Sequence, residues 1–292
     1  MAAPPNGGAA DDMGTVTEDK AMTHRTPPAA TAEAGIARVK AAAATKTEAI
    51  RAAAARGLYA PGREHDACGV GFIANMKNAK SHQILVDGLA MLENLTHRGA
   101  VGADPLMGDG AGLLVQIPDR FFREEMAAQG VELPKAGDYA VGHIFMPRDD
   151  SHRAHIEEIV REVAQAEGIP FIGFRDVPVD NASLSKAPHI AAAEPVHRQA
   201  FFGRPEGLEI DDDFERRLYI LRKVISGRIF TEAGGKEDGA YIVSLSARTI
   251  VYKGMFLAYQ VGAYYRDLKD PRFETALVLV HQRFSTNTFP SW

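Results

Sequence analysis

The residue best suited to chemistry in this chain of 292 residues is its single cysteine, Cys68. A lone cysteine cannot form an internal disulfide, and it cannot supply a metal site built from several cysteines. Cys68 is therefore either a small buried apolar residue, which is the commoner role, or a reactive thiol. It stands at the first position of the apolar run CGVGFIA rather than inside it, and this position favours the reactive thiol.

Cleavage between Ala67 and Cys68 would place a free α-amine on the residue that carries the thiol. The unperturbed pKa of an α-amine is about 7.7–8.0, and that of a thiol is about 8.5. The amine can therefore take the thiol proton near neutral pH, directly or through water, as in enzymes whose nucleophile is an N-terminal threonine. This mechanism gives residues 1–67 the role of a removable leader.

Arg98 lies between a helical pattern and a glycine-rich run in THRGAVGADPLMGDGAG, residues 96–112. Either it is a cation at the C-terminal end of a helix, or it is held beside a pocket. The run is not GxGxxG and lacks a Lys-Ser/Thr ending, so a phosphate-binding loop is not predicted. Gly108, Gly110 and Gly112 indicate a close approach of the backbone to another segment or to a small ligand.

A second polar cluster follows the apolar run LVLV in LVLVHQRFSTNT, residues 277–288. A buried strand that opens into polar residues is a common way to present a site. Arg283 of this cluster could form a bidentate pair with a substrate carboxylate. An ion pair between strand and loop is an equal alternative. No metal site is predicted, because His152 and His155 lack a third ligand at a suitable spacing.

The composition is that of an ordinary globular protein, with 46% hydrophobic and 24% charged residues. The net charge of −5 argues against nucleic acid as a partner. No run of about 18 apolar residues predicts a membrane span. The N-terminal segment also lacks the pattern of a secretory signal. We therefore expect a cytoplasmic protein without a membrane partner.

One α+β unit that starts at Cys68 must position these residues. Ahead of it, residues 1–67 are expected to be an Ala-rich leader, disordered over 1–31, helical over 32–56 and turn-rich over 58–67. The apolar patterns predict strands over 68–76, 107–118, 139–147 and 275–288. They predict extended segments over 169–179 and 189–203 and a hairpin over 240–254. Helices are predicted over 81–100, 119–130, 150–168 and 211–235. This order favours antiparallel layers over a doubly wound sheet. The sequence stops directly after a polar loop, which we interpret as a truncation inside a domain.

The motifs CGVGFIA, LTHRGAVGAD, GDGAG and HQRFSTNTFPSW together resemble the N-terminal region of the large (alpha) subunits of the glutamate synthase family. That region is a class II glutamine amidotransferase domain, and the resemblance covers about residues 58–292. The resemblance implies an N-terminal-nucleophile hydrolase fold, which is a four-layer αββα sandwich, here truncated at its C-terminal side. Residues 68–292 would then be an incomplete amidotransferase domain.

The resemblance also implies a role for each residue that matches a family motif. Cys68, made the first residue by loss of the leader, would be the nucleophile that attacks the side-chain amide of L-glutamine. Arg283 matches the arginine that binds the α-carboxylate of glutamine, and Arg98 matches the arginine of HRG beside the nucleophile. Thr286 and Asn287 fall in the loop on the substrate side. The implied reaction passes through a γ-glutamyl thioester and releases ammonia, then glutamate.

One departure from the family concerns the oxyanion hole. In the family, the Asn-Gly pair that forms it follows shortly after the PSW segment, and a substrate-binding aspartate follows later, but neither is in this chain. One oxyanion donor is typically worth about 10²–10³ in rate, so we expect the fragment itself to be at best a poor glutaminase.

Complete family members continue into domains that bind FMN and an iron–sulfur cluster and add the ammonia to 2-oxoglutarate, with NADPH or ferredoxin as the electron source. The implied partners are these remaining domains and a small beta subunit, and no cofactor is expected in the fragment. Two alternatives stay open. One is a class II amidotransferase that serves a phosphoribosyl or sugar-phosphate acceptor, against which the long leader and GDGAG argue. The other is a non-catalytic fragment, which the missing oxyanion hole favours.

Overall fold

A computed structural model describes residues 67–102, 104–233, 240–285, 287–288 and 290–292, together with scattered residues between 41 and 57. The described residues between 41 and 56 are helical, in agreement with the helix predicted there. The disorder predicted for residues 1–31 lies outside the described residues, as does most of the predicted linker. No helix among the described residues is long and apolar enough to cross a membrane.

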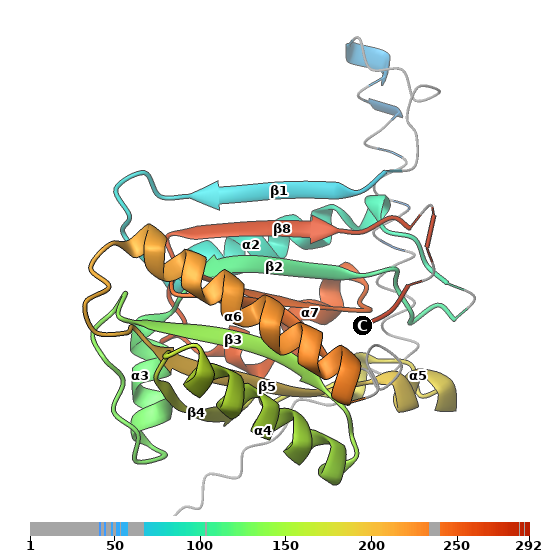
Figure 1. The fold of residues 1–292 in the computed structure, drawn as a ribbon. Helices are drawn as coiled ribbons and strands as arrows, with labels where there is room; N and C mark the ends of the chain where they lie inside the picture. The colour runs from blue at the N-terminus through green and yellow to red at the C-terminus, as the bar shows by residue number, and fades with distance from the viewer. Residues whose placement is uncertain are drawn as a thin grey trace, which may run out of the picture.

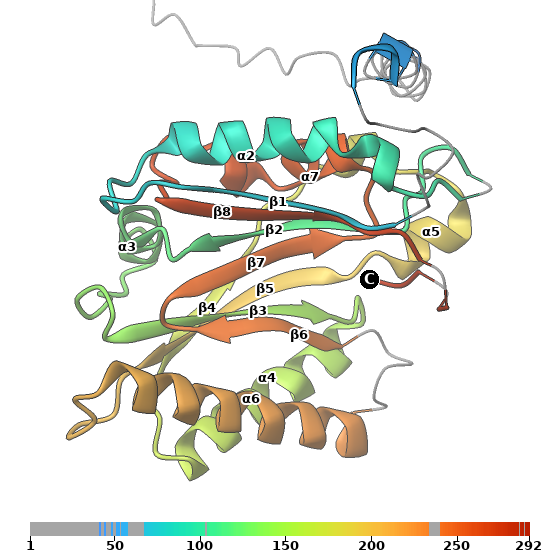
Figure 2. The same cartoon turned by 90° about the horizontal axis from the view of Figure 1, so that it is seen from above.

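The first sheet brings the first and last described strands side by side. Its antiparallel strands run in the order β1 (Gly69–Ala74), β8 (Leu277–Gln282), β2 (Ala111–Gln116) and β7 (Thr249–Gly254) (Figure 1). Alternation in LVLVHQ gives β8 one buried face with Val278 and Val280 and an opposite face that carries Leu279. Helices α2 (His82–Asn94) and α7 (Ala258–Tyr264) cover the buried face (Figure 2).

The second sheet is also antiparallel, with the order β4 (Phe171–Asp176), β5 (Val196–Gly203), β3 (Tyr139–Met146) and β6 (Tyr241–Ser246). Every residue of β3 is buried, because the strand lies between the first sheet and the outer helices α4 (Asp150–Ala166) and α6 (Asp211–Glu232) (Figure 2). The buried positions of α4 include the predicted apolar stripe, Ile156, Ile159, Val160 and Val163. The α+β class with antiparallel sheets is therefore confirmed.

The hairpin predicted over 240–254 is wrong, because its two strands belong to different sheets. Strand β6 pairs with β3, whereas β7 pairs with β2. The turn between them is held by Glu215 of α6. Its carboxylate accepts hydrogen bonds from the Ala247 N–H at 2.7 Å and from the Ser246 hydroxyl at 3.0 Å. The chain therefore passes from one sheet to the other at this corner.

The remaining helices are α3 (Asp119–Ala127), which lies within its predicted range, and α5 (Pro188–Ala193). Helix α5 occupies part of the segment over 189–203 that was predicted to be extended, and that prediction is wrong for it. Its proline stands in the first turn, where no amide donor is needed, and the alanines that follow favour a helix.

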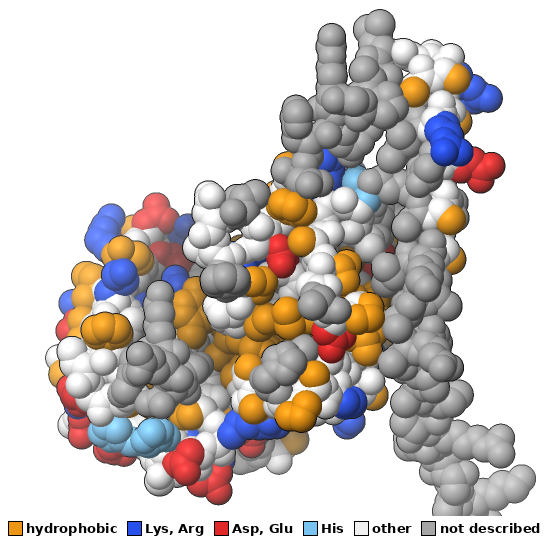
Figure 3. Space-filling model, turned by 90° about the vertical axis from the view of Figure 1, so that its right-hand side faces the viewer, with side chains coloured by type: hydrophobic (Ala, Val, Ile, Leu, Met, Phe, Trp, Pro, Cys, Tyr) orange, Lys and Arg blue, Asp and Glu red, His pale blue; other side chains and the backbone are white. Residues whose placement is uncertain are grey.

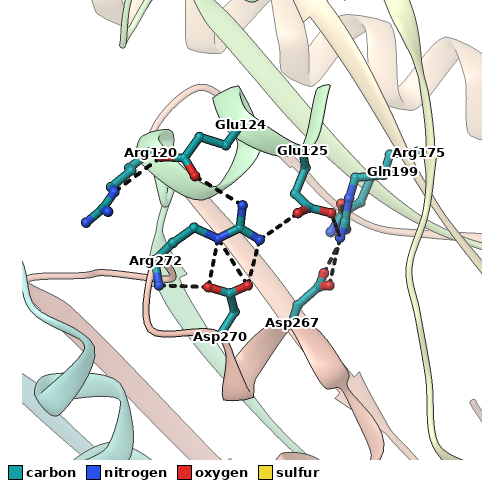
Figure 4. Close-up of polar contacts among 8 residues, drawn as sticks. All are labelled: Arg120, Glu124, Glu125, Arg175, Gln199, Asp267, Asp270 and Arg272. Atoms are coloured by element: carbon teal, nitrogen blue, oxygen red, sulfur yellow. Dashed lines mark hydrogen bonds and ion pairs between the residues drawn. The ribbon is translucent and has the colours of Figure 1, made fainter. Parts of the chain in front are cut away.

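A buried ion pair connects the second sheet with β7. Arg175 of β4 donates hydrogen bonds to both carboxylate oxygens of Asp267, at 2.8 and 2.9 Å, and the Tyr252 hydroxyl of β7 donates a third at 2.9 Å. The side chains of Arg175 and Asp267 are only 4% and 1% exposed. The network continues through Glu125 to Arg272 (Figure 4). Through Asp267 it links β4 of the second sheet to β7 of the first sheet.

Candidate active site

Cys68 directly precedes β1 and lies beside the end of β8, because the strand register pairs Gly69 with Gln282. The Phe284 N–H donates to the Cys68 sulfur at 3.4 Å, and the thiol lies 3.7 Å from the Phe284 carbonyl oxygen. The residue is exposed. The alternative of an inert, buried cysteine therefore does not hold in this structure.

Arg98 packs close to the start of β1. It is the last residue of a short 3₁₀ turn, Thr96–Arg98, that follows α2. A Cβ atom built on Gly69 would lie 3.0 Å from the Cβ and 3.1 Å from the Cγ of Arg98. The missing side chain at Gly69 therefore lets the stem of Arg98 approach the backbone next to Cys68. The next residue, Gly99, packs in the same way against the side chain of Gln282.

Arg283 leaves the end of β8 and is held by neutral oxygen atoms. Its guanidinium donates to the Asp109 carbonyl at 3.2 Å and to the Thr288 hydroxyl at 2.7 Å. Its side chain passes over Gly110, where a Cβ atom would lie 3.6 Å from the Cδ of Arg283. No carboxylate of the described residues forms an ion pair with Arg283, so the alternative of an ion pair between strand and loop is not seen there. The positive charge is left for another partner.

The loop after Arg283 is anchored on the GDGAG segment. The Ser285 N–H donates to a carboxylate oxygen of Asp109 at 2.5 Å, and the Ser285 hydroxyl donates to the Thr288 carbonyl at 2.5 Å. Asn287 is exposed in this loop, whereas Thr286 lies outside the described residues. Sequence reasoning missed Asp109 as the anchor, although an acidic residue between two glycines was the available signal.

An open pocket of about 1120 Å³ lies between the two sheets at this end of the molecule. Figure 3 views this end and shows hydrophobic side chains gathered in the centre of the face. Charged residues and one histidine also line the pocket: Asp109, Arg148, Glu194, Lys253, His281 and Arg283. Arg283 begins the loop beside Cys68, Asp109 anchors that loop, and both residues line the pocket. Cys68 itself does not line the pocket.

The charge of Arg283 acts on two other basic residues of the pocket. Burial lowers the pKa of Lys253, and the positive charge of Arg283 lowers it further. The same two causes lower the pKa of His281. Since like charges destabilise the protonated forms, this part of the pocket favours an anionic group. The sequence placed His281 in the polar cluster that follows LVLV but did not single out Lys253, for which the alternation of its strand was the only available signal.

The family of class II glutamine amidotransferases matches residues 68–292 of the chain. The Glutamate synthase (NADPH) large chain of Bacillus subtilis is 44% identical over 240 residues, which are 82% of this chain and 15% of that protein. The Glutamate synthase (NADH) of Saccharomyces cerevisiae is 41% identical over 249 residues, which are 81% of this chain and 11% of that protein.

The chloroplastic Ferredoxin-dependent glutamate synthase 2 of Arabidopsis thaliana is 38% identical over 229 residues, which are 78% of this chain and 14% of that protein. The resemblance predicted from the motifs is thereby confirmed. The chain spans only 11% to 15% of the length of these relatives.

Proposed function

The chain belongs to the class II glutamine amidotransferases, and we propose that its Cys68 site hydrolyses L-glutamine to glutamate and ammonia, as the glutaminase part of a glutamate synthase. One observation carries this proposal. The backbone of Phe284 contacts the Cys68 sulfur, at 3.4 Å, directly next to Arg283. A thiol nucleophile and a cation without a carboxylate partner among the described residues thus stand together. Attack on the amide of an amino acid that is held by its α-carboxylate needs these two groups.

In the proposed reaction, loss of residues 1–67 gives Cys68 a free α-amine. The amine takes the thiol proton, and the thiolate attacks the amide carbon of the glutamine side chain. The C–N bond breaks, the α-ammonium returns the proton to the leaving nitrogen, and ammonia departs from a γ-glutamyl thioester. Water then adds to the thioester carbon, and the C–S bond breaks to release glutamate and restore the thiol.

The other site residues support this reaction in the proposal. Arg283 binds the α-carboxylate of glutamine, and Arg98 borders the nucleophile through its packing on the next residue of β1. Thr286 and Asn287 belong to the loop on the substrate side, and Asp109 holds that loop on the GDGAG segment. Asp109 acts as a positioning residue, because its carboxylate binds the protein backbone rather than the substrate.

The proposal also covers the architecture. Residues 68–292 would be the amidotransferase domain and residues 1–67 its leader. The domain would have the four-layer αββα arrangement of N-terminal-nucleophile hydrolases. The order of helices and sheets in Figure 2 supports this assignment, since α2 and α7 cover the first sheet while α4 and α6 cover the second.

For the whole protein we propose a cytoplasmic glutamate synthase that passes the ammonia to 2-oxoglutarate. Its FMN and its iron–sulfur cluster would act with other domains of that protein. The electron source, which is NADPH or ferredoxin, and a small beta subunit would act with those domains as well. Iron–sulfur clusters are held by several cysteine thiolates, and this chain has one cysteine. The residues of this chain therefore do not fit the cluster, and no step is assigned to it.

Ammonia release from L-glutamine tests the proposed function. A chain that begins at Cys68 should release ammonia slowly, and the Cys68→Ser variant should release none above background. A chain that keeps residues 1–67 is the matched comparison, and it should be inactive because its residue 68 has no free α-amine. Ammonia release that persists in Cys68→Ser would contradict the proposed function.

A further inference from the structure

Three basic side chains share the inner face of the first sheet, at the end that opens into the pocket. Lys253 of β7 pairs with Gly112 of β2, and Gly112 pairs with His281 of β8. These positions form one row across the sheet, and Arg283 follows two residues after His281. Since side chains two residues apart point to the same side of a strand, all three basic groups face the second sheet. All three line the pocket.

The position of Lys253 is fixed by its neighbours. A Cβ atom built on Gly112 would lie 2.7 Å from the Cβ of Lys253, so a larger residue at position 112 would clash with the lysine stem. The ammonium lies 4.7 Å from the ring centre of Tyr241 and 5.4 Å from that of Phe145. Both rings come from the second sheet, so the lysine spans the gap between the sheets. Aromatic faces attract a cation but leave its charge formally uncompensated.

The acidic residues of the pocket are occupied elsewhere. The Asp109 carboxylate accepts the Ser285 N–H, and the Glu194 carboxylate accepts the Tyr264 hydroxyl at 2.8 Å. No carboxylate of the described residues forms an ion pair with Lys253. The depressed pKa of Lys253, caused by burial and by Arg283, agrees with a cation that lacks an acidic partner.

We propose that Lys253, His281 and Arg283, the basic cluster, bind a small dicarboxylate, with one carboxylate on Arg283 and the other on Lys253. The inference rests on the proposed function, which assigns the α-carboxylate of the ligand to Arg283. L-Glutamate, the product of that reaction, carries a second carboxylate where L-glutamine carries a neutral amide. With this carboxylate on Lys253, the product occupies a pose distinct from the reacting one, because Cys68 does not line the pocket. The basic cluster therefore makes the pocket prefer the product over the substrate.

Binding of both ligands to the 292-residue chain tests this inference, with dissociation constants measured by isothermal titration calorimetry. Lys253→Met keeps the aliphatic stem between the two rings but removes the charge. It should weaken binding of L-glutamate about tenfold, the typical effect of one charge-assisted hydrogen bond. It should change binding of L-glutamine less than about twofold. Lys223→Met, on the exposed surface of α6, is the control and should change neither.

Three results would overturn the inference: no binding of L-glutamate to the unaltered chain, equal weakening of both ligands in Lys253→Met, or no weakening at all. Should Lys253→Met fail to fold, carbon-13 NMR of the lysine side chains in the unaltered chain decides. Saturating L-glutamate should raise the pKa of Lys253, whereas L-glutamine should not, and an unchanged pKa with both ligands overturns the inference. Failure of the proposed function is separate: it appears as ammonia release that is independent of Cys68, whatever the ligand preference.

Discussion

Replacement of Asp267 by alanine should be among the most destabilising single substitutions in the described fold. The substitution removes the carboxylate that accepts two hydrogen bonds from the Arg175 guanidinium, at 2.8 and 2.9 Å, and one from the Tyr252 hydroxyl. Glu125, at 3.0 Å, would be the remaining anionic partner of Arg175. Loss of one partner of a buried ion pair typically costs about 3–5 kcal/mol. Because Glu125 remains, we expect a loss of about 3 kcal/mol in the free energy of unfolding.

Glu124→Ala provides a matched control in the same network (Figure 4). It removes ion pairs with Arg272 at 3.1 Å and with Arg120 at 3.4 Å, but the Glu124 side chain is 48% exposed. Exposed pairs contribute about 0–1 kcal/mol, so this variant should change the free energy of unfolding by less than about 1 kcal/mol. Urea unfolding at pH 7, followed by circular dichroism, compares the two. A loss in Asp267→Ala no larger than that in Glu124→Ala would refute the idea that the buried pair ties the sheets together.

Three further predictions concern pH, backbone packing and the loop anchor. Burial lowers the pKa of His143 to about 4, so the unfolded chain, with a pKa of about 6.5, takes up the proton first. The free energy of unfolding should then fall by on the order of 3 kcal/mol from pH 7 to pH 4. In the His143→Phe variant, urea titrations should show a smaller fall of this free energy over the same pH range. A Cβ atom at Gly108 would lie 2.3 Å from the Phe256 carbonyl oxygen, so Gly108→Ala should destabilise the fold by about 1–3 kcal/mol. Gly227→Ala, in open space on α6, should stabilise the fold by about 0.5–1 kcal/mol. Thermal unfolding should therefore show a lower midpoint temperature for Gly108→Ala and a higher one for Gly227→Ala. Asp109→Ala should slow alkylation of Cys68 by a glutamine-like electrophile about tenfold, because the loop loses a charge-assisted hydrogen bond. The rate at which iodoacetamide alkylates Cys68, measured by mass spectrometry, should be unchanged. If alkylation by both reagents slowed equally, a positioning role for Asp109 would be contradicted.

The elements that the sequence predicted well have a strong local period of apolar residues. The stripe that begins with Ile156 in α4 and the alternation in β8 each show a clear buried face, and the structure buries those positions. The segment over 240–254 is paired by residues that are distant in the sequence. Its pattern indicates two strands with a short turn, but the sheet that each strand joins depends on contacts made by Glu215, which comes from a distant helix.

In the candidate site, too, local patterns predicted single residues, whereas long-range pairing decides which of them meet. Cys68 and Arg283 were each predicted at a strand boundary, from residue type and local pattern. Their proximity depends on the pairing of β1 with β8, which joins segments more than 200 residues apart and leaves no local trace in the sequence. Lys253 was missed, because the aromatic rings that position its ammonium come from the other sheet.

The central claim is that Cys68 and Arg283 form one glutamine site. It is tested most directly by alkylation of the chain with two reagents: a glutamine analogue that carries an electrophilic ketone in place of the amide, and the same compound without its α-carboxylate. Peptide mass spectrometry gives the site and the rate of modification. We predict that the carboxylate-bearing analogue modifies Cys68 at least about tenfold faster, and that Arg283→Met abolishes this preference. Equal rates for the two reagents in the unaltered chain, or modification at other residues, would contradict the account.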